Sequence, residues 1–127
     1  MNDQEYLEHC LELLDEYSMD LAKRTEHLPP EDPLRELCDA FCALADNHTD
    51  LYARGAELVA RLFTTYPELA PALPRQLLWF FGGDCLHYMP DEEIAQFQQL
   101  EDMMLEAEAA GEPFNIRDAR AKLLNLQ

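Results

Sequence analysis

The sequence has no hydrophobic run of membrane-spanning length. Its apolar runs, such as residues 77–81, are far shorter than the roughly 20 residues that a transmembrane helix needs. The first ten residues, MNDQEYLEHC, are polar and acidic and lack the positive and apolar segments of a secretory signal. We therefore expect no membrane insertion and a cytoplasmic location, where the four cysteines remain thiols.

The chain also lacks the period-two alternation of β-strands, internal repeats and low-complexity tracts. Apolar residues instead recur at three- and four-residue steps, and prolines separate the segments that carry this pattern. The predicted helices span about residues 3–24, 33–46, 50–66, 74–81, 90–110 and 116–124. The expected N-caps are Asp32, Thr49 or Asp50, and Asn115. The predicted fold is all-α: one domain, residues 1–127, forming a compact bundle of five to six helices with short proline-rich connections.

The few glycines predict specific backbone features. Gly55 lies on the apolar face of the third predicted helix, where Gly costs about 1 kcal/mol relative to Ala, and close approach of a neighbouring helix would explain it. Gly82 and Gly83 directly follow Phe81, an arrangement typical of a helix C-terminus. The stretch 77–93 combines aromatic residues, two glycines, Cys85, His87 and several acids. We interpret it as a corner between two helices rather than as a site.

Catalytic motifs are missing. The chain contains no Gly-rich phosphate loop after a strand, no G-x-S-x-G and no H-E-x-x-H, so we expect no cofactor and favour a non-enzymatic protein. One alternative stays open, a metal- or thiol-dependent protein. Cys38 and Cys42 are one helical turn apart, Cys85 and His87 are two residues apart, and these four would suit zinc if they converged. Cys-x2-Cys spacing, which structural zinc sites usually show, is absent.

Positive charge is scarce. Nine Lys and Arg residues face 26 Asp and Glu residues, which gives a net charge of −17. Residues 1–20 hold seven acids and residues 91–112 hold eight, and neither stretch contains a Lys or Arg. A field of this sign repels nucleic acid and anionic lipid and attracts basic proteins, although solubility alone is a simpler explanation. The reversed charge of residues 113–127 suggests that Arg117, Arg120 and Lys122 fold back onto the acidic end of the preceding helix.

The two basic-free helices carry the functional prediction. We expect a small acidic interaction protein, an adaptor, inhibitor or immunity-like binder of a basic protein surface. The expected partner-binding residues are Glu8, Glu12, Asp15, Glu16, Glu101, Asp102, Glu106 and Glu108. A nucleic-acid mimic is a narrower version of this hypothesis. Homo-oligomerisation also stays open, because the adjacent Met103 and Met104 cannot both point into one core.

Overall fold

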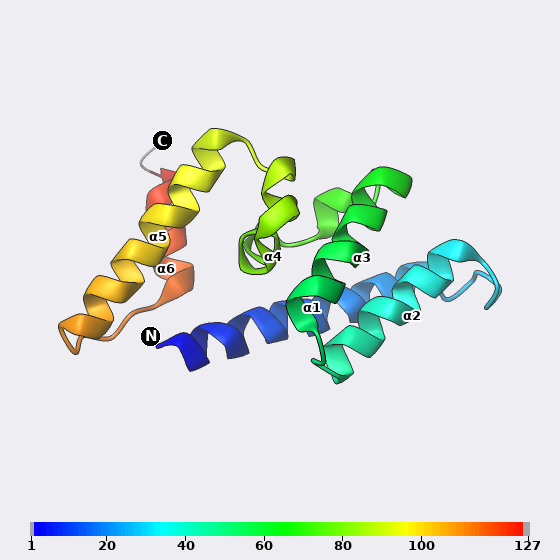
Figure 1. Ribbon diagram of the computed structural model, residues 1–127, viewed down its shortest axis with the longest axis horizontal. Coiled ribbons are helices and arrows are strands. Elements are labelled where there is room, and N and C mark those ends of the chain that lie inside the picture. The colour runs from blue at the N-terminus through cyan, green and yellow to red at the C-terminus, as the bar shows by residue number, and fades with distance from the viewer. Residues whose placement is uncertain (1, 126–127) are drawn as a thin grey trace. The chain divides into compact units, whose positions relative to one another are not determined.

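The computed structural model describes residues 2–125 and contains only helices and their connections over that range (Figure 1). The predicted all-α fold is confirmed. The described helices are α1 (Asp3–Thr25), α2 (Pro33–Asp46), α3 (Leu51–Thr65), η1 (Ala70–Ala72), α4 (Arg75–Phe81), η2 (Gly83–Tyr88), α5 (Asp91–Ala109) and α6 (Ile116–Asn125). The six α-helices agree with the prediction, whereas the short 3₁₀ helices η1 and η2 make the total number of helices higher than expected. Among the described residues, no helix is long and apolar enough to cross a membrane.

The chain divides into two compact units. One comprises Met1–His9 and Met89–Gln127, and the other comprises Cys10–Tyr88. The single domain predicted from the sequence therefore remains a prediction.

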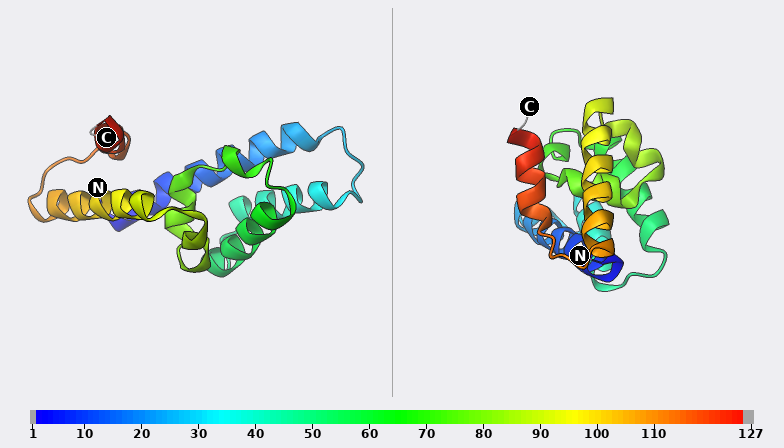
Figure 2. Two further views of the ribbon diagram at one scale, coloured as in Figure 1. Left: turned by 90° about the horizontal axis from the view of Figure 1, so that it is seen from above. Right: turned by 90° about the vertical axis from the view of Figure 1, so that its left-hand side faces the viewer.

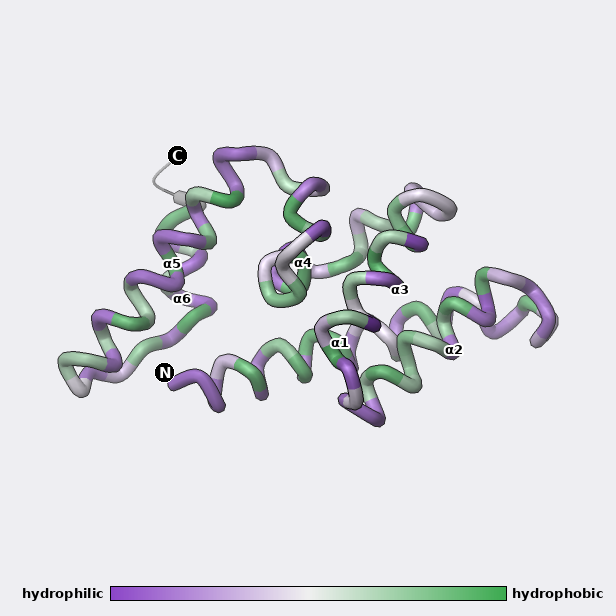
Figure 3. The backbone as a smooth tube through the Cα atoms, viewed as in Figure 1, coloured by the Kyte–Doolittle hydropathy of each residue, from purple (hydrophilic) through white to green (hydrophobic). Residues whose placement is uncertain are grey.

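In the unit Cys10–Tyr88, the part of α1 from Cys10 onward packs against α2 through aromatic and sulfur contacts. The rings of Tyr17 and Phe41 meet edge to face, with their centroids 5.5 Å apart. The Cys42 thiol donates to the Ser18 carbonyl oxygen at 3.7 Å. These contacts lie among the buried residues of the two helices, and Figure 3 shows that α2 is largely hydrophobic along its length.

Helix α3 packs against α4 at Gly55. Gly55 is buried, and a Cβ atom at this position would overlap the ring of Phe81. The close approach that the sequence predicted is therefore confirmed, and it explains why a glycine is placed in a helix interior. Further along α3, the Phe63 ring stacks on the Tyr88 ring with 4.3 Å between centroids. Arg75 donates to the Tyr88 carbonyl oxygen at 2.9 Å and so ties the start of α4 to the end of η2.

Most of the expected helix ends are confirmed. Asp32 accepts a hydrogen bond from the Leu34 amide at 2.9 Å, and Asn115 accepts one from the Asp118 amide at 3.0 Å. Asp50 is the N-cap of α3, but it adopts a left-handed conformation, with a φ of 54°, and its side chain makes no capping bond. Gly82, the C-cap of α4, has a φ of 64°, in agreement with the predicted corner.

In the other unit, α6 lies beside α5 after residues 110–115 turn the chain back (Figure 2). The buried face of α5 consists of Phe97, Leu100 and Met104, and the guanidinium carbon of Arg120 lies 5.1 Å from the centroid of the Phe97 ring. The predicted return of the C-terminal segment onto the fifth helix is therefore confirmed as packing.

Candidate functional site

The exposed face of α1 within the unit Cys10–Tyr88 carries three of the predicted partner-binding acids. Glu12, Asp15 and Glu16 are all exposed. Asp15 and Glu16 come three and four residues after Glu12, so the three lie on one side of the helix. The opposite side is buried and consists of Cys10, Leu14, Tyr17, Ser18, Leu21 and Thr25. The amphipathic pattern of the sequence thus fixes which side of α1 faces solvent.

A large apolar residue lies within this acidic face. Met19 is 58% exposed and is four residues after Asp15 and three after Glu16. Its neighbours on the helix surface are therefore these two carboxylates on the N-terminal side, and Ala22 and Lys23 on the C-terminal side. The sequence analysis missed Met19, although its position, two residues from the buried Tyr17 and two from the buried Leu21, already placed it off the inner stripe. We refer to Glu12, Asp15, Glu16 and Met19 as the α1 face.

The carboxylates of the α1 face have no charge partner of their own. Among residues 2–125, no ion pair involves Glu12, Asp15 or Glu16. The face ends at Asp20, whose carboxylate pairs with Arg24 at 3.0 Å. Glu12 lies one turn from both Asp15 and Glu16, so these like charges repel one another, and no ion pair of theirs in the described structure offsets that repulsion.

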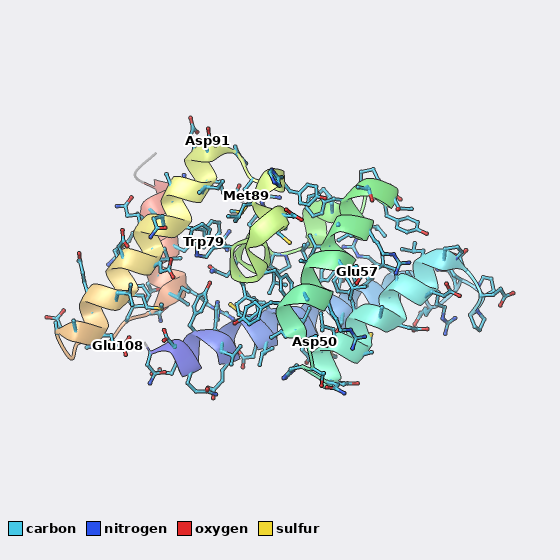
Figure 4. All side chains as sticks on the ribbon, viewed as in Figure 1. Asp50, Glu57, Trp79, Met89, Asp91 and Glu108 are labelled. Carbon is cyan, nitrogen blue, oxygen red and sulfur yellow. The ribbon has the colours of Figure 1, made fainter. Side chains whose placement is uncertain are left out.

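Glu8 also lies on α1, in the part that belongs to the other unit. It is exposed and accepts a hydrogen bond from the Gln4 side chain at 3.2 Å. The remaining predicted acids are on α5. Asp102, Glu106 and Glu108 are exposed, and Glu101 is half-buried. Glu108 lies near the C-terminal end of that helix (Figure 4).

The α5 surface repeats the combination of acids and one exposed apolar residue. Leu105 is 49% exposed and lies three residues after Asp102 and one before Glu106. Of the adjacent methionines, Met104 is buried and Met103 is half-buried, as expected for neighbours that cannot share a core. Leu105, which the sequence analysis did not single out, is therefore the more exposed apolar side chain of this helix.

The four residues of the alternative metal set do not come together. Cys85 is buried, whereas the His87 side chain is 81% exposed and lies 3.9 Å from the fully exposed side chain of Asp84. Cys38 is buried in α2, and Cys42 is half-buried one turn later. Within residues 2–125, no three His, Cys, Asp or Glu side chains are grouped so that they would hold a metal ion.

The thiols are also poorly suited to act as nucleophiles. Burial, together with a smaller contribution from Cys38, raises the pKa of Cys42 to about 11. Burial likewise raises the pKa of Cys85, with a smaller contribution from the charge of Asp84. Since the thiolate is the reactive form, both side chains are held as unreactive thiols near neutral pH. The exposed His87 is not positioned to deprotonate the buried Cys85.

Comparison with known proteins gives one family. The profile of the family described as PA2817-like matches residues 2–127, so the chain belongs to that family. No curated protein matches the sequence. No solved structure matches it either.

Proposed function

We propose that this member of the PA2817-like family is a small acidic, non-enzymatic protein that binds a basic surface of another protein. The observation that carries the proposal is the α1 face, where three exposed carboxylates without a charge partner lie on the same side of the helix as the exposed Met19. A basic partner would neutralise the repulsion among these carboxylates on binding, so charge complementarity favours association.

Met19 gives the α1 face more than charge. Purely electrostatic attraction between exposed groups weakens with salt, since the screening length is about 8 Å at physiological ionic strength. The exposed Met19 side chain at the end of this acidic face provides contact area that salt does not screen, and interfaces usually combine apolar with polar contacts in this way. The proposed partner surface therefore combines Lys or Arg residues with a shallow apolar depression that accepts Met19.

Binding of a basic protein surface is the expected activity of an adaptor, an inhibitor or an immunity-like protein. The net charge of −17 supports a partner that is neither nucleic acid nor an anionic membrane. All four cysteines are free thiols, which supports the proposed cytoplasmic location. The acids of α5 around Leu105 form a second candidate contact surface with the same chemistry.

An alternative is that the exposed apolar residues of α5 mediate self-association. Leu105 and Met103 together would provide a contact for a second copy, although Asp102 and Glu106 would then face like charges. The mass of the purified protein in solution, measured by light scattering at low and high salt, tests this use. A dimer that is stabilised by salt, because salt screens the repulsion, would favour self-association over the binding of a basic partner.

The test of the proposed function is affinity capture from the source lysate, washed first at low and then at high salt, with the metal content of the purified protein measured on the same sample. We expect a basic protein that is retained at low salt and released at high salt. Stoichiometric metal without any retained basic protein would contradict the proposal and would favour the thiol-dependent alternative.

A specificity control is available within the chain. Glu26, Glu57 and Glu68 are also exposed acids, but they lie outside the α1 face. Glu57 is on α3 (Figure 4), three residues after Arg54 and four before Arg61. The triple variant E12Q/D15N/E16Q and the control variant E26Q/E57Q/E68Q change the net charge by the same amount. Retention of the captured protein should be lost only in the first variant.

A further inference from the structure

The C-terminal helix α6 is a short basic helix that packs on an acidic one. Residues 91–112, which include α5, hold eight acids and no Lys or Arg, whereas α6 holds three basic residues and a single acid, Asp118. The two helices lie side by side within one unit of the chain (Figure 1). The guanidinium carbon of Arg120 lies 5.1 Å from the centroid of the Phe97 ring. The chain itself thus shows how a basic helix sits on α5.

The apolar residues of the two helices have the same spacing. The buried residues are Phe97, Leu100 and Met104 on α5, and Ile116, Ala119 and Leu123 on α6. In each set a step of three residues is followed by a step of four, so each set forms a stripe along one side of its helix. An amphipathic helix that lays such a stripe on an apolar surface is a common mode of peptide recognition. We refer to Phe97, Leu100 and Met104 as the α5 stripe.

The construction of the two helices allows α6 to leave α5. Helix α6 has ten residues, and isolated helices shorter than about 12–15 residues are marginal in water, so α6 depends on packing for its stability. Its exposed Arg117 and Lys122 form no ion pair among residues 2–125. The end of α5 does not need α6, because backbone bonds within residues 106–112 close it: the Ala110 amide donates to the Glu106 carbonyl oxygen at 3.0 Å and the Glu112 amide to that of Ala107 at 2.9 Å.

We propose that the α5 stripe is a docking site for a basic amphipathic helix of the partner protein, and that α6 covers this site until the partner helix displaces it. The inference rests on the proposed function, since it names the segment of the basic partner that the protein binds. Charge complementarity selects the occupant, because the eight acids of residues 91–112 attract a helix with Lys and Arg and repel an acidic one.

The small residue in the middle of α6 explains how a partner can win. Ala119 buries little apolar area between Ile116 and Leu123, and a partner helix with Leu at that position buries more. The partner competes with a tethered helix, whose effective concentration is on the order of millimolar for a short flexible connection. Release of α6 is therefore an autoinhibitory step, which a weakly apolar basic helix does not overcome.

The test is fluorescence anisotropy of two labelled peptides with the full-length protein. One peptide has the sequence of residues 113–127, and the other is unrelated, with Leu at the three stripe positions and Lys or Arg on its other sides. The variant L123D prevents docking of α6, and A121D puts the same charge on its exposed side. We expect L123D to bind both peptides at least about 10-fold more tightly than the wild type does, and A121D to bind them like the wild type. Peptides with Glu in place of Lys and Arg should not bind.

A second readout uses the wild-type protein, so it does not depend on the folding of a variant. Amide hydrogen exchange should be at least about 10-fold faster in α6 than in the centre of α5, because α6 opens locally. Excess unrelated peptide should speed exchange in α6 further. The proposal is wrong if L123D binds the peptides no better than A121D, if only the peptide of residues 113–127 binds, or if the unrelated peptide leaves exchange in α6 unchanged.

The outcome is separable from that of the proposed function. The peptide measurements need no captured protein, and the variant E12Q/D15N/E16Q leaves the α5 stripe intact. A basic protein that is captured through the α1 face, together with peptides that fail to bind L123D, would overturn the docking site alone. Peptides that bind L123D while no basic protein is captured would support the docking site and contradict the proposed function.

Discussion

The ring of Phe81 fills the space that a Cβ atom on Gly55 would occupy, so α3 and α4 approach each other at a point where only glycine fits. Phe81 also contacts Phe80, with 5.4 Å between ring centroids, and Phe80 contacts Tyr52 at 5.1 Å. Adding one methyl group at position 55 must therefore displace a ring that is itself packed against other rings.

Replacing Gly55 by Ala should destabilise the protein despite the better helix propensity of Ala. Overpacking costs about 1–3 kcal/mol and the gain in propensity is about 1 kcal/mol, so we expect a net loss of up to about 2 kcal/mol. Urea unfolding of G55A measures this loss. In the background of F81L, which removes the ring, the same substitution should cost less or become stabilising. Equal costs in both backgrounds would show that Phe81 is not the obstacle.

Replacing Tyr17 by Phe should leave stability unchanged or raise it. The Tyr17 hydroxyl is buried without a partner, so its removal relieves a desolvation cost of about 1–3 kcal/mol, while the edge-to-face contact with Phe41 is kept. Thermal unfolding of Y17F and the wild type makes the comparison. A clear loss of stability would mean that the hydroxyl has a partner in the folded protein.

The protein should lose stability at alkaline pH. In the folded chain, burial raises the pKa of Tyr17 to about 12 and also raises the pKa of Cys85, from ordinary values of 10.0 and 9.0. A raised pKa of this kind contributes stability below the unfolded-state pKa, and the contribution is lost as pH rises toward the folded-state value. The free energy of unfolding should therefore be constant near pH 8 and fall above about pH 9, more shallowly above pH 10 in Y17F. A rise in stability above pH 9 would contradict the burial of these groups.

Neutralising the α1 face should not weaken the fold. Glu12 and Glu16 are four residues apart on exposed helix surface, where like charges cost about 0.2–0.5 kcal/mol per pair. The variant E12Q/D15N/E16Q should accordingly be as stable as the wild type or slightly more stable at low salt, and the difference should shrink at high salt. Thermal unfolding at two salt concentrations measures both effects. A destabilised variant would indicate that these acids have structural partners.

The helical fold follows from the sequence because its apolar residues keep a helical period between prolines. Gly55 and Gly82 could be interpreted in advance, since glycine in those positions has few physical explanations. The position of Met19 off the inner stripe could be read from the sequence, but how far Met19 and Leu105 are exposed depends on the direction in which neighbouring helices pack. The separation of Cys85 from His87 also required the structure. A 3₁₀ helix directs residues two apart to different sides, and η2 was not predicted.

The most direct test of the central claim is the dissociation constant of the captured basic partner for three forms of the protein, each measured at two salt concentrations. The forms are the wild type, E12Q/D15N/E16Q and the charge-matched control E26Q/E57Q/E68Q. We expect the first variant to bind at least about 10-fold more weakly, with a smaller dependence on salt, and the control to bind like the wild type. If both variants weaken binding equally, the partner responds only to net charge, and the α1 face is not the binding site.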